Sequence, residues 1–156
     1  MVEFVLFMLQ GIPEMTGAVA LCMILARVNL SWKRALIVGL ILSLLIYAVK
    51  STTVFWGFHC LLALLIIMIY LFRYCNVPIY LAFTASIITQ TILLILENIF
   101  VLISFYVLSL NKEIILTNQF YWFLQGLPQA LAILGLAYFL NKVKPKLLFE
   151  TNANNA

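Results

Sequence analysis

Five long apolar runs alternate with short polar segments along the chain. A helix needs about 20 apolar residues to cross the hydrocarbon core of a bilayer, so each run predicts a transmembrane helix. The fourth run would make about 48 Å of helix against about 30 Å of hydrocarbon, so we expect it to tilt, kink or project. The pattern predicts an all-α integral membrane bundle of five helices, at residues 4–26, 34–49, 54–72, 79–110 and 118–140.

The composition supports a membrane protein over a soluble one. Of the 156 residues 66% are hydrophobic, only 9% are charged, and Asp is absent. A soluble domain of this size has no core large enough to bury so much apolar surface. We therefore expect the positive residues behind the net charge of +4 to set the orientation in the membrane and to contact anionic lipid, and not to bind nucleic acid.

Positive charges decide the orientation of the predicted helices. If the N-terminus is outside, the outer segments carry only Lys50 and Lys112. The inner segments then carry Arg27, Lys33, Arg34, Arg73, Lys142, Lys144 and Lys146. This excess is typical of cytoplasmic loops, so we expect the C-terminus inside and the plasma membrane as the location. One transmembrane domain would cover residues 1–146, followed by a short, disordered polar tail at 147–156.

A repeated phrase lies in the first and last predicted helices, as LQGIPE at residues 9–14 and LQGLPQ at residues 124–129. The two copies are 115 residues apart and parallel in the five-helix topology. Proline removes a helical hydrogen bond and glycine tolerates bending, so we expect both helices to be kinked there. The predicted hinge residues are Gly11, Pro13, Gly126 and Pro128. Ordinary helix packing is the alternative explanation of this repeat.

The depth of each polar residue in the membrane can be estimated by counting residues along its predicted helix, and several of them come out at a similar depth. On about 1.5 Å per residue, Gln10 and Gln125 lie at one depth, with Glu14 and Gln129 four positions further on the same faces. Glu97 falls near the same depth, and Gln90 shares its face of the fourth helix, which we expect to be turned toward protein. Carboxylates are costly in a bilayer, and no Lys or Arg in the interior of the predicted helices is available to neutralise them. The predicted ligand- or ion-binding site comprises Gln10, Glu14, Gln90, Glu97, Gln125 and Gln129.

Other signals of chemistry are weak. The sequence contains no metalloprotease, nucleophile-elbow or phosphate-loop motif, and only one His, so we expect no enzymatic activity and no catalytic residue. Cys22, Cys60 and Cys75 have no metal-binding spacing and are expected to be free thiols. We interpret His59 as an interfacial or packed residue. No metal or cofactor is expected.

Three short segments carry a family resemblance: GIPE at residues 11–14, Glu97 late in the fourth run, and GLP at residues 126–128. With them, residues 3–146 resemble the N-terminal membrane regions of sensor histidine kinases from Firmicute-type bacteria. The resemblance implies a region that receives a signal and passes it through the last helix to a cytoplasmic kinase module. Because this sequence ends about ten residues after Lys146, we expect a standalone membrane subunit without that module.

Two functions and a structural alternative follow from these observations. The first is a sensory or regulatory membrane module, acting through a separate signalling partner in the cytoplasm or membrane, or through homo-oligomerisation. The second is a small transporter or channel, or the substrate-binding subunit of one, with the polar cluster as its pathway. The third is a purely structural oligomer, in which the repeated phrase serves packing only.

Overall fold

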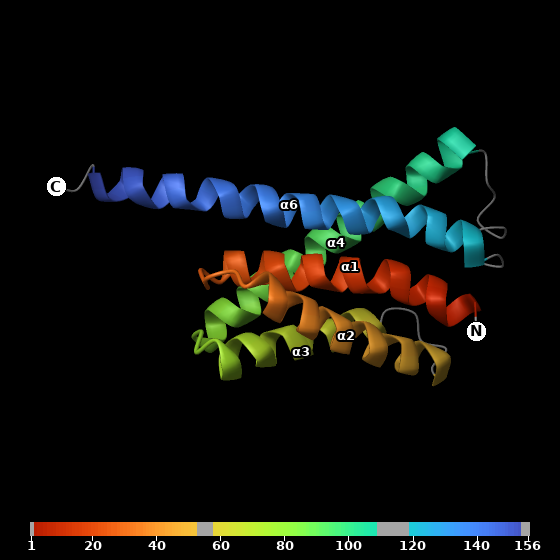
Figure 1. Ribbon diagram of the computed structural model, residues 1–156, viewed down its shortest axis with the longest axis horizontal. Coiled ribbons are helices and arrows are strands. Elements are labelled where there is room, and N and C mark those ends of the chain that lie inside the picture. The colour runs from red at the N-terminus through yellow and green to blue at the C-terminus, as the bar shows by residue number, and fades with distance from the viewer. Residues whose placement is uncertain (1, 53–57, 109–118, 154–156) are drawn as a thin grey trace.

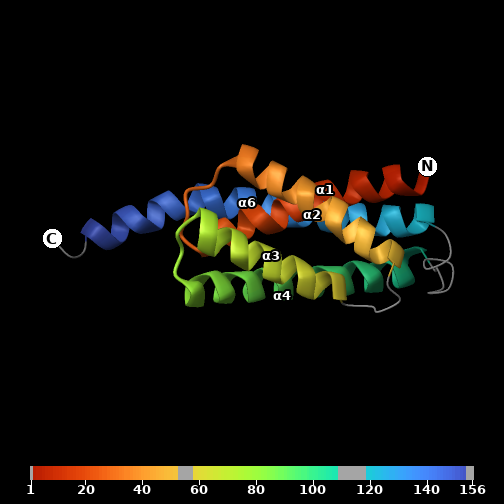
Figure 2. The same ribbon diagram turned by 90° about the horizontal axis from the view of Figure 1, so that it is seen from below.

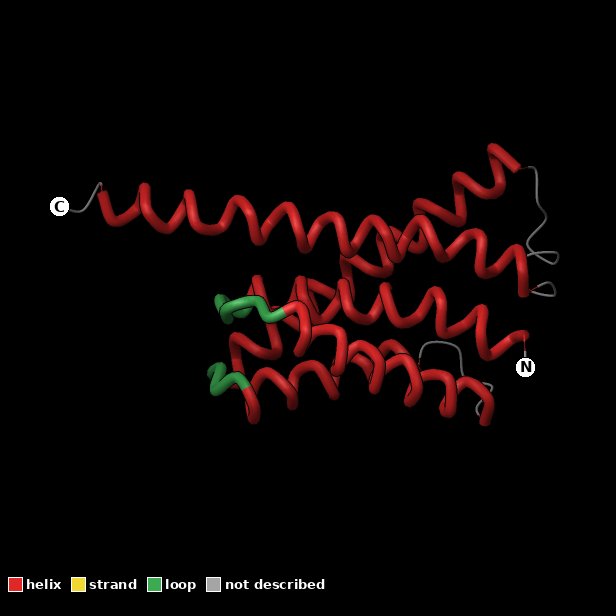
Figure 3. Tube along the Cα trace, in the orientation of Figure 1, coloured by secondary structure: helices red, strands yellow, loops and turns green. Residues whose placement is uncertain are grey.

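The computed structural model describes residues 2–52, 58–108 and 119–153, which form five α-helices and no strand (Figures 1 and 3). The helices are α1 Val2–Leu25, α2 Trp32–Thr52, α3 Phe58–Tyr74, α4 Ile79–Leu108 and α6 Gln119–Ala153. All except α3 are long and apolar enough to cross a membrane, and α3 contains a shorter apolar segment, His59–Tyr74. The all-helical architecture is therefore confirmed, with four helices that are long and apolar enough to cross a membrane, whereas the exact number of membrane crossings stays a prediction. Residues 54–57, 109–110 and 118 of the predicted spans, and Lys112, lie outside the described residues.

The fourth helix is continuous through Glu97 and Asn98, so the described residues contain no break that would divide it into two spans. Figure 1 shows α4 inclined to α1 and α6, as expected for a helix of about 45 Å in about 30 Å of hydrocarbon. The helix is preceded by Pro78, whose carbonyl accepts hydrogen bonds from the amides of Leu81 and Ala82. Proline suits this place because an amide in the first turn has no helical partner.

The last helix is longer than the predicted span. It runs without interruption from Gln119 to Ala153, through the segment 147–153 where we expected a disordered tail. The Leu, Glu and Ala residues of this segment have good helix propensity, which explains how the helix continues beyond the apolar run. Figures 1 and 2 show its C-terminal part extending past the ends of the other helices.

The two described connections, residues 26–31 and 75–78, lie at the end of the bundle from which α6 extends (Figure 2). Arg27 and Asn76 adopt positive φ angles of 58° and 52° there. Arg27 closes α1: its amide donates to the Ile24 carbonyl and the Val28 amide donates to the Met23 carbonyl, which together form a Schellman motif. Arg27 lies in the first connection, and Lys33, Arg34 and Arg73 lie in the adjoining turns of α2 and α3, so these positive charges gather at one end of the bundle. The predicted orientation requires this arrangement, although the orientation itself stays a prediction.

The core is built around α1, which is buried almost continuously from Met15 to Ile24. Small residues bring its neighbours close. A Cβ placed on Gly39 of α2 would lie 2.7 Å from the backbone nitrogen of Thr16, and one placed on Gly17 would lie 3.0 Å from that of Leu134 in α6. Inside a bilayer the hydrophobic effect does not drive helices together, so close packing of their backbones holds them instead. Both α2 and α6 therefore pack tightly against α1.

The Gln-Gly-x-Pro phrases lie inside α1 and α6, and neither phrase interrupts its helix. Pro13 is half-buried and Pro128 is exposed. The kinks that we expected at these positions stay a prediction.

Candidate functional site

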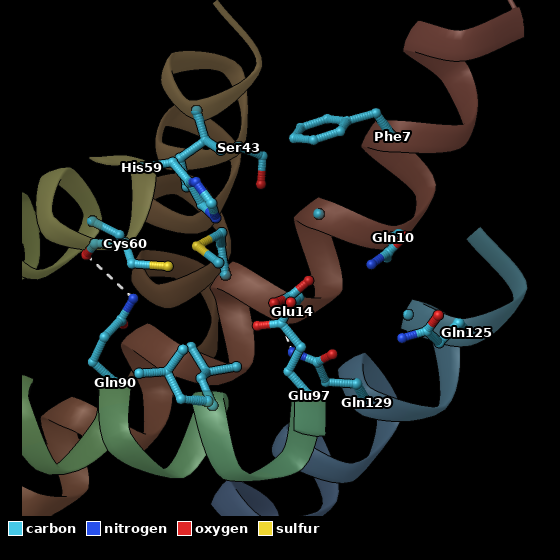
Figure 4. Close-up of a pocket in the computed structure, with 17 residues that line it drawn as sticks. Phe7, Gln10, Glu14, Ser43, His59, Cys60, Gln90, Glu97, Gln125 and Gln129 are labelled. Carbon is cyan, nitrogen blue, oxygen red and sulfur yellow. Dashed lines mark hydrogen bonds between the residues drawn. The ribbon is translucent and has the colours of Figure 1, made fainter. Parts of the chain in front are cut away.

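A cavity of about 110 Å³ lies among the five described helices, at the depth of the repeated phrases. Every described helix contributes to its wall (Figure 4). Its lining residues are Phe7, Gln10, Gly11, Glu14 and Met15 of α1; Ser43 and Ile46 of α2; His59, Cys60 and Ala63 of α3; Gln90, Leu93, Leu94 and Glu97 of α4; and Gln125, Gly126 and Gln129 of α6.

The structure brings into this one cavity all six polar residues that depth counting selected, namely Gln10, Glu14, Gln90, Glu97, Gln125 and Gln129. Figure 4 shows Gln10, Glu14, Glu97, Gln125 and Gln129 around one space between the helices, whereas Gln90 points to the backbone of Cys60. The two glycines of the repeated phrases also line the cavity, whereas the two prolines are not among its lining residues. A cavity with several convergent polar groups is the first candidate for a binding site in a helical bundle.

The two copies of the repeated phrase meet in register. Nε2 of Gln129 donates a hydrogen bond of 3.1 Å to Oε1 of Glu14, and these residues occupy equivalent positions in the two copies, 115 residues apart. Gly126 accommodates the Gln10 amide, because a Cβ added at Gly126 would overlap Nε2 and Cδ of Gln10. The glycine of one copy therefore receives the glutamine of the other, and the carboxylate of α1 is held by the carboxamide of α6.

Two acceptor atoms in the cavity have no hydrogen-bond partner. They are Oε1 of Gln10, a residue with only 5% of its surface exposed, and Oε1 of Gln125. Gln90 differs, since its Nε2 donates to the Cys60 carbonyl at 3.2 Å. An unpaired buried oxygen costs about 1–3 kcal/mol, so this cavity favours a group that donates hydrogen bonds.

The ionisable groups of the cavity are mainly acidic. Glu14 and Glu97 supply two carboxylates, and no Lys or Arg is among the described residues that line it. Glu97 differs from our expectation, because its side chain is exposed although it borders the cavity. Its carboxylate therefore lies at an accessible edge of the cavity, whereas Glu14 is half-buried and bonded to α6.

Sequence reasoning missed several lining residues, of which His59 is the most informative. We expected an interfacial or packed histidine, and the structure places it in the wall beside Cys60 (Figure 4). The depth count would have found it, because His59 lies about 8 Å along the third run and thus near Gln10. Ser43 of α2 gave no such signal, since its hydroxyl bonds the Gly39 carbonyl as many membrane serines do.

Within the described part of the chain, no three His, Cys, Asp or Glu residues are grouped so that they could hold a metal ion. Comparisons with protein-family models, curated proteins and solved structures find no match to this chain. The chemistry of the cavity therefore carries the functional proposal.

The equivalent glycines Gly11 and Gly126 give a matched pair of variants. Gly126→Ala is expected to displace the Gln10 amide and to change the cavity, because the added methyl takes the place of that amide. In Gly11→Ala the added Cβ lies 3.5 Å from Phe7 and Ser43, an ordinary contact, so the cavity is expected to keep its shape. The ¹⁵N chemical shift of the Gln10 side chain in lipid checks this. An equal shift of that signal in both variants would contradict the described packing.

Proposed function

We propose that this chain is a non-enzymatic sensory or regulatory module of the bacterial cytoplasmic membrane. A small cation or polar ligand in the cavity would bias the packing of α1 against α6. The observation that carries this proposal is the Gln129–Glu14 hydrogen bond, which joins the two helices at the cavity wall. A ligand can shift a conformational equilibrium only through contacts that differ between the two states, and this bond is such a contact.

The charges of the cavity favour a cation. An ionised carboxylate within a bilayer costs several kcal/mol unless a proton, a cation or hydrogen-bond donors neutralise it. The described lining provides amide donors and the imidazole of His59, but neither Lys nor Arg. A cation that engages Glu14 competes with Nε2 of Gln129 for the same carboxylate oxygen. Binding is therefore expected to loosen the bond between α1 and α6.

The last helix provides the route for the output. Gln125 and Gln129 are part of the same continuous helix that extends past the bundle to Ala153. About 36 Å of helix separates Gln129 from that end, on about 1.5 Å per residue. A change of α6 packing at the cavity would thus move a segment that a cytoplasmic or membrane partner, or a second copy of the chain, can contact. This agrees with the resemblance to sensor kinase membrane regions.

The test is a distance measurement across α1 and α6 in lipid. Spin labels at Leu9→Cys and Leu131→Cys, both exposed positions, are introduced after the three native cysteines are replaced by serine. The distance distribution is recorded in sodium, potassium and ammonium chloride at constant ionic strength. We expect at least one salt to shift the distribution, and we expect Glu14→Gln to abolish the shift. Identical distributions in all salts would reject the proposal.

A transport function is the second candidate, and the exposed carboxylate of Glu97 at the edge of the cavity is the observation that favours it. Such a group could admit an ion to the cavity. Flux of ²²Na⁺, ⁸⁶Rb⁺ and ¹⁴C-methylammonium into proteoliposomes separates the two functions. A sensory module alone is expected to give the flux of empty liposomes, whereas flux that Glu97→Gln abolishes would establish transport.

A further inference from the structure

We infer that the cavity takes a cation that donates hydrogen bonds, of the ammonium or short primary alkylammonium class. The inference rests on the proposed function of the same cavity, because it names the class of ligand that this function would use. It is argued from the acceptor atoms, the size and the apolar wall of the cavity.

The acceptors of the cavity come from both copies of the repeated phrase. Oε1 of Gln10 and Oε1 of Gln125 occupy equivalent positions in α1 and α6, and both lack a partner. Glu14 adds a carboxylate four residues beyond Gln10, and Glu97 adds a second from α4. A primary ammonium group has three N–H donors and no acceptor, so its donors are as many as two amide oxygens and one carboxylate require. Its bond to the carboxylate would be charge-assisted and correspondingly strong.

Other cations fit the described lining less well. A quaternary ammonium has no N–H donor and is usually held by several aromatic faces, whereas Phe7 is the one aromatic residue among the described lining residues. It would leave the amide oxygens of Gln10 and Gln125 unpaired. A calcium ion requires six to eight oxygen ligands, and magnesium requires near-octahedral geometry. The described carboxylates do not gather into such a set.

The size of the cavity limits the rest of the ligand. A volume of about 110 Å³ is larger than one water molecule needs. It accommodates an ammonium group with a short alkyl chain. The apolar side chains of its lining, which can contact this chain, are Phe7, Met15, Ile46, Ala63, Leu93 and Leu94.

The test is a selectivity series on the full-length protein in lipid nanodiscs. The thermal unfolding midpoint is measured by tryptophan fluorescence against ammonium, methylammonium, tetramethylammonium, sodium and potassium chloride, at constant pH and ionic strength. We expect a saturable rise with ammonium and methylammonium, and no comparable rise with tetramethylammonium, sodium or potassium. This comparison uses the natural sequence and so does not depend on any variant folding.

Variants then locate the binding. Gln10→Met and Gln125→Met keep the length of the side chain and remove the acceptor oxygen, so each is expected to lower the methylammonium affinity about tenfold or more. Asn98→Leu is the control, because this exposed amide bonds the Leu94 carbonyl of its own helix and does not line the cavity. Its affinity is expected to equal that of the natural sequence.

The outcomes separate this inference from the proposed function. Saturable, Glu14-dependent stabilisation that is equal for sodium, potassium and tetramethylammonium would overturn the ammonium class and leave a cation-responsive module standing. Stabilisation by none of the salts, together with salt-independent distances between α1 and α6, would reject both. Selective stabilisation by ammonium and methylammonium that survives in Gln10→Met and Gln125→Met would place the ligand elsewhere and overturn the site.

Discussion

Gly39→Ala is expected to lower the free energy of unfolding by about 1–3 kcal/mol, as overpacking a tight contact does. The added Cβ would lie 2.7 Å from the backbone nitrogen of Thr16 and 2.8 Å from its Cα. Backbone atoms cannot rotate away as a side chain can, so α2 must move from α1 and lose packing along the whole contact. Reversible unfolding by sodium dodecyl sulfate in mixed micelles measures the change.

Gly135→Ala is the matched control for that variant. Gly135 also lies within a long apolar helix, but a Cβ added there meets no atom within 4 Å. We expect its free energy of unfolding to stay within about 0.5 kcal/mol of the natural sequence. Equal destabilisation by the two alanines would mean that glycine itself, and not the approach of α2 to α1, sets the stability.

Glu14→Gln is expected to remove the cation response with little change in the fold, which is the largest functional effect that the site predicts. A carboxamide has the shape of a carboxylate and still offers Oε1 to the Gln129 donor, but it carries no charge. Losing a charge-assisted hydrogen bond is expected to weaken cation binding about 10- to 100-fold. Titration of the unfolding midpoint with methylammonium chloride measures the affinity.

Two further variants make this result specific. Glu3→Gln removes an exposed carboxylate in the first turn of α1, outside the cavity, and is expected to bind as the natural sequence does. The exchange Glu14→Gln with Gln129→Glu returns the carboxylate to the same cavity from α6, and is expected to restore part of the affinity. Unchanged affinity in Glu14→Gln alone would exclude this carboxylate from the site.

Much of the architecture could be predicted from the sequence, because the length of an apolar run and the charges that flank it are properties of a whole segment and do not depend on detailed packing. The lengths of the apolar runs located the helices, and the fourth run proved to be one continuous helix through Glu97. The convergence of Gln10, Glu14 and Gln129 could also be predicted, because two parallel helices with the same phrase place equivalent residues at one depth. Their ligand, however, stays a matter for experiment.

The remaining features depend on which helices are neighbours and on how each helix is rotated about its axis. The depth of a residue along its own helix determines neither of these. The Gln129–Glu14 bond requires α6 to pack directly on α1, and nothing in the repeated phrase specifies that contact. Rotation decides that Gln90 points at the Cys60 carbonyl and that Glu97 is exposed at the cavity edge. The continuation of α6 to Ala153 was not predicted because a polar composition was taken to indicate disorder, although the Leu, Glu and Ala residues of this segment favour a helix.

The central claim is that a cation binds in the cavity that Glu14 and Glu97 line. Solid-state NMR of the protein in lipid, with ¹³C in the glutamate side chains, observes these groups directly, and Glu14→Gln and Glu97→Gln assign the two Cδ signals. We predict that both signals shift in a saturable way as methylammonium chloride is added at constant ionic strength, while the Glu3 signal does not. Signals of Glu14 and Glu97 that stay in place at every concentration would contradict the claim.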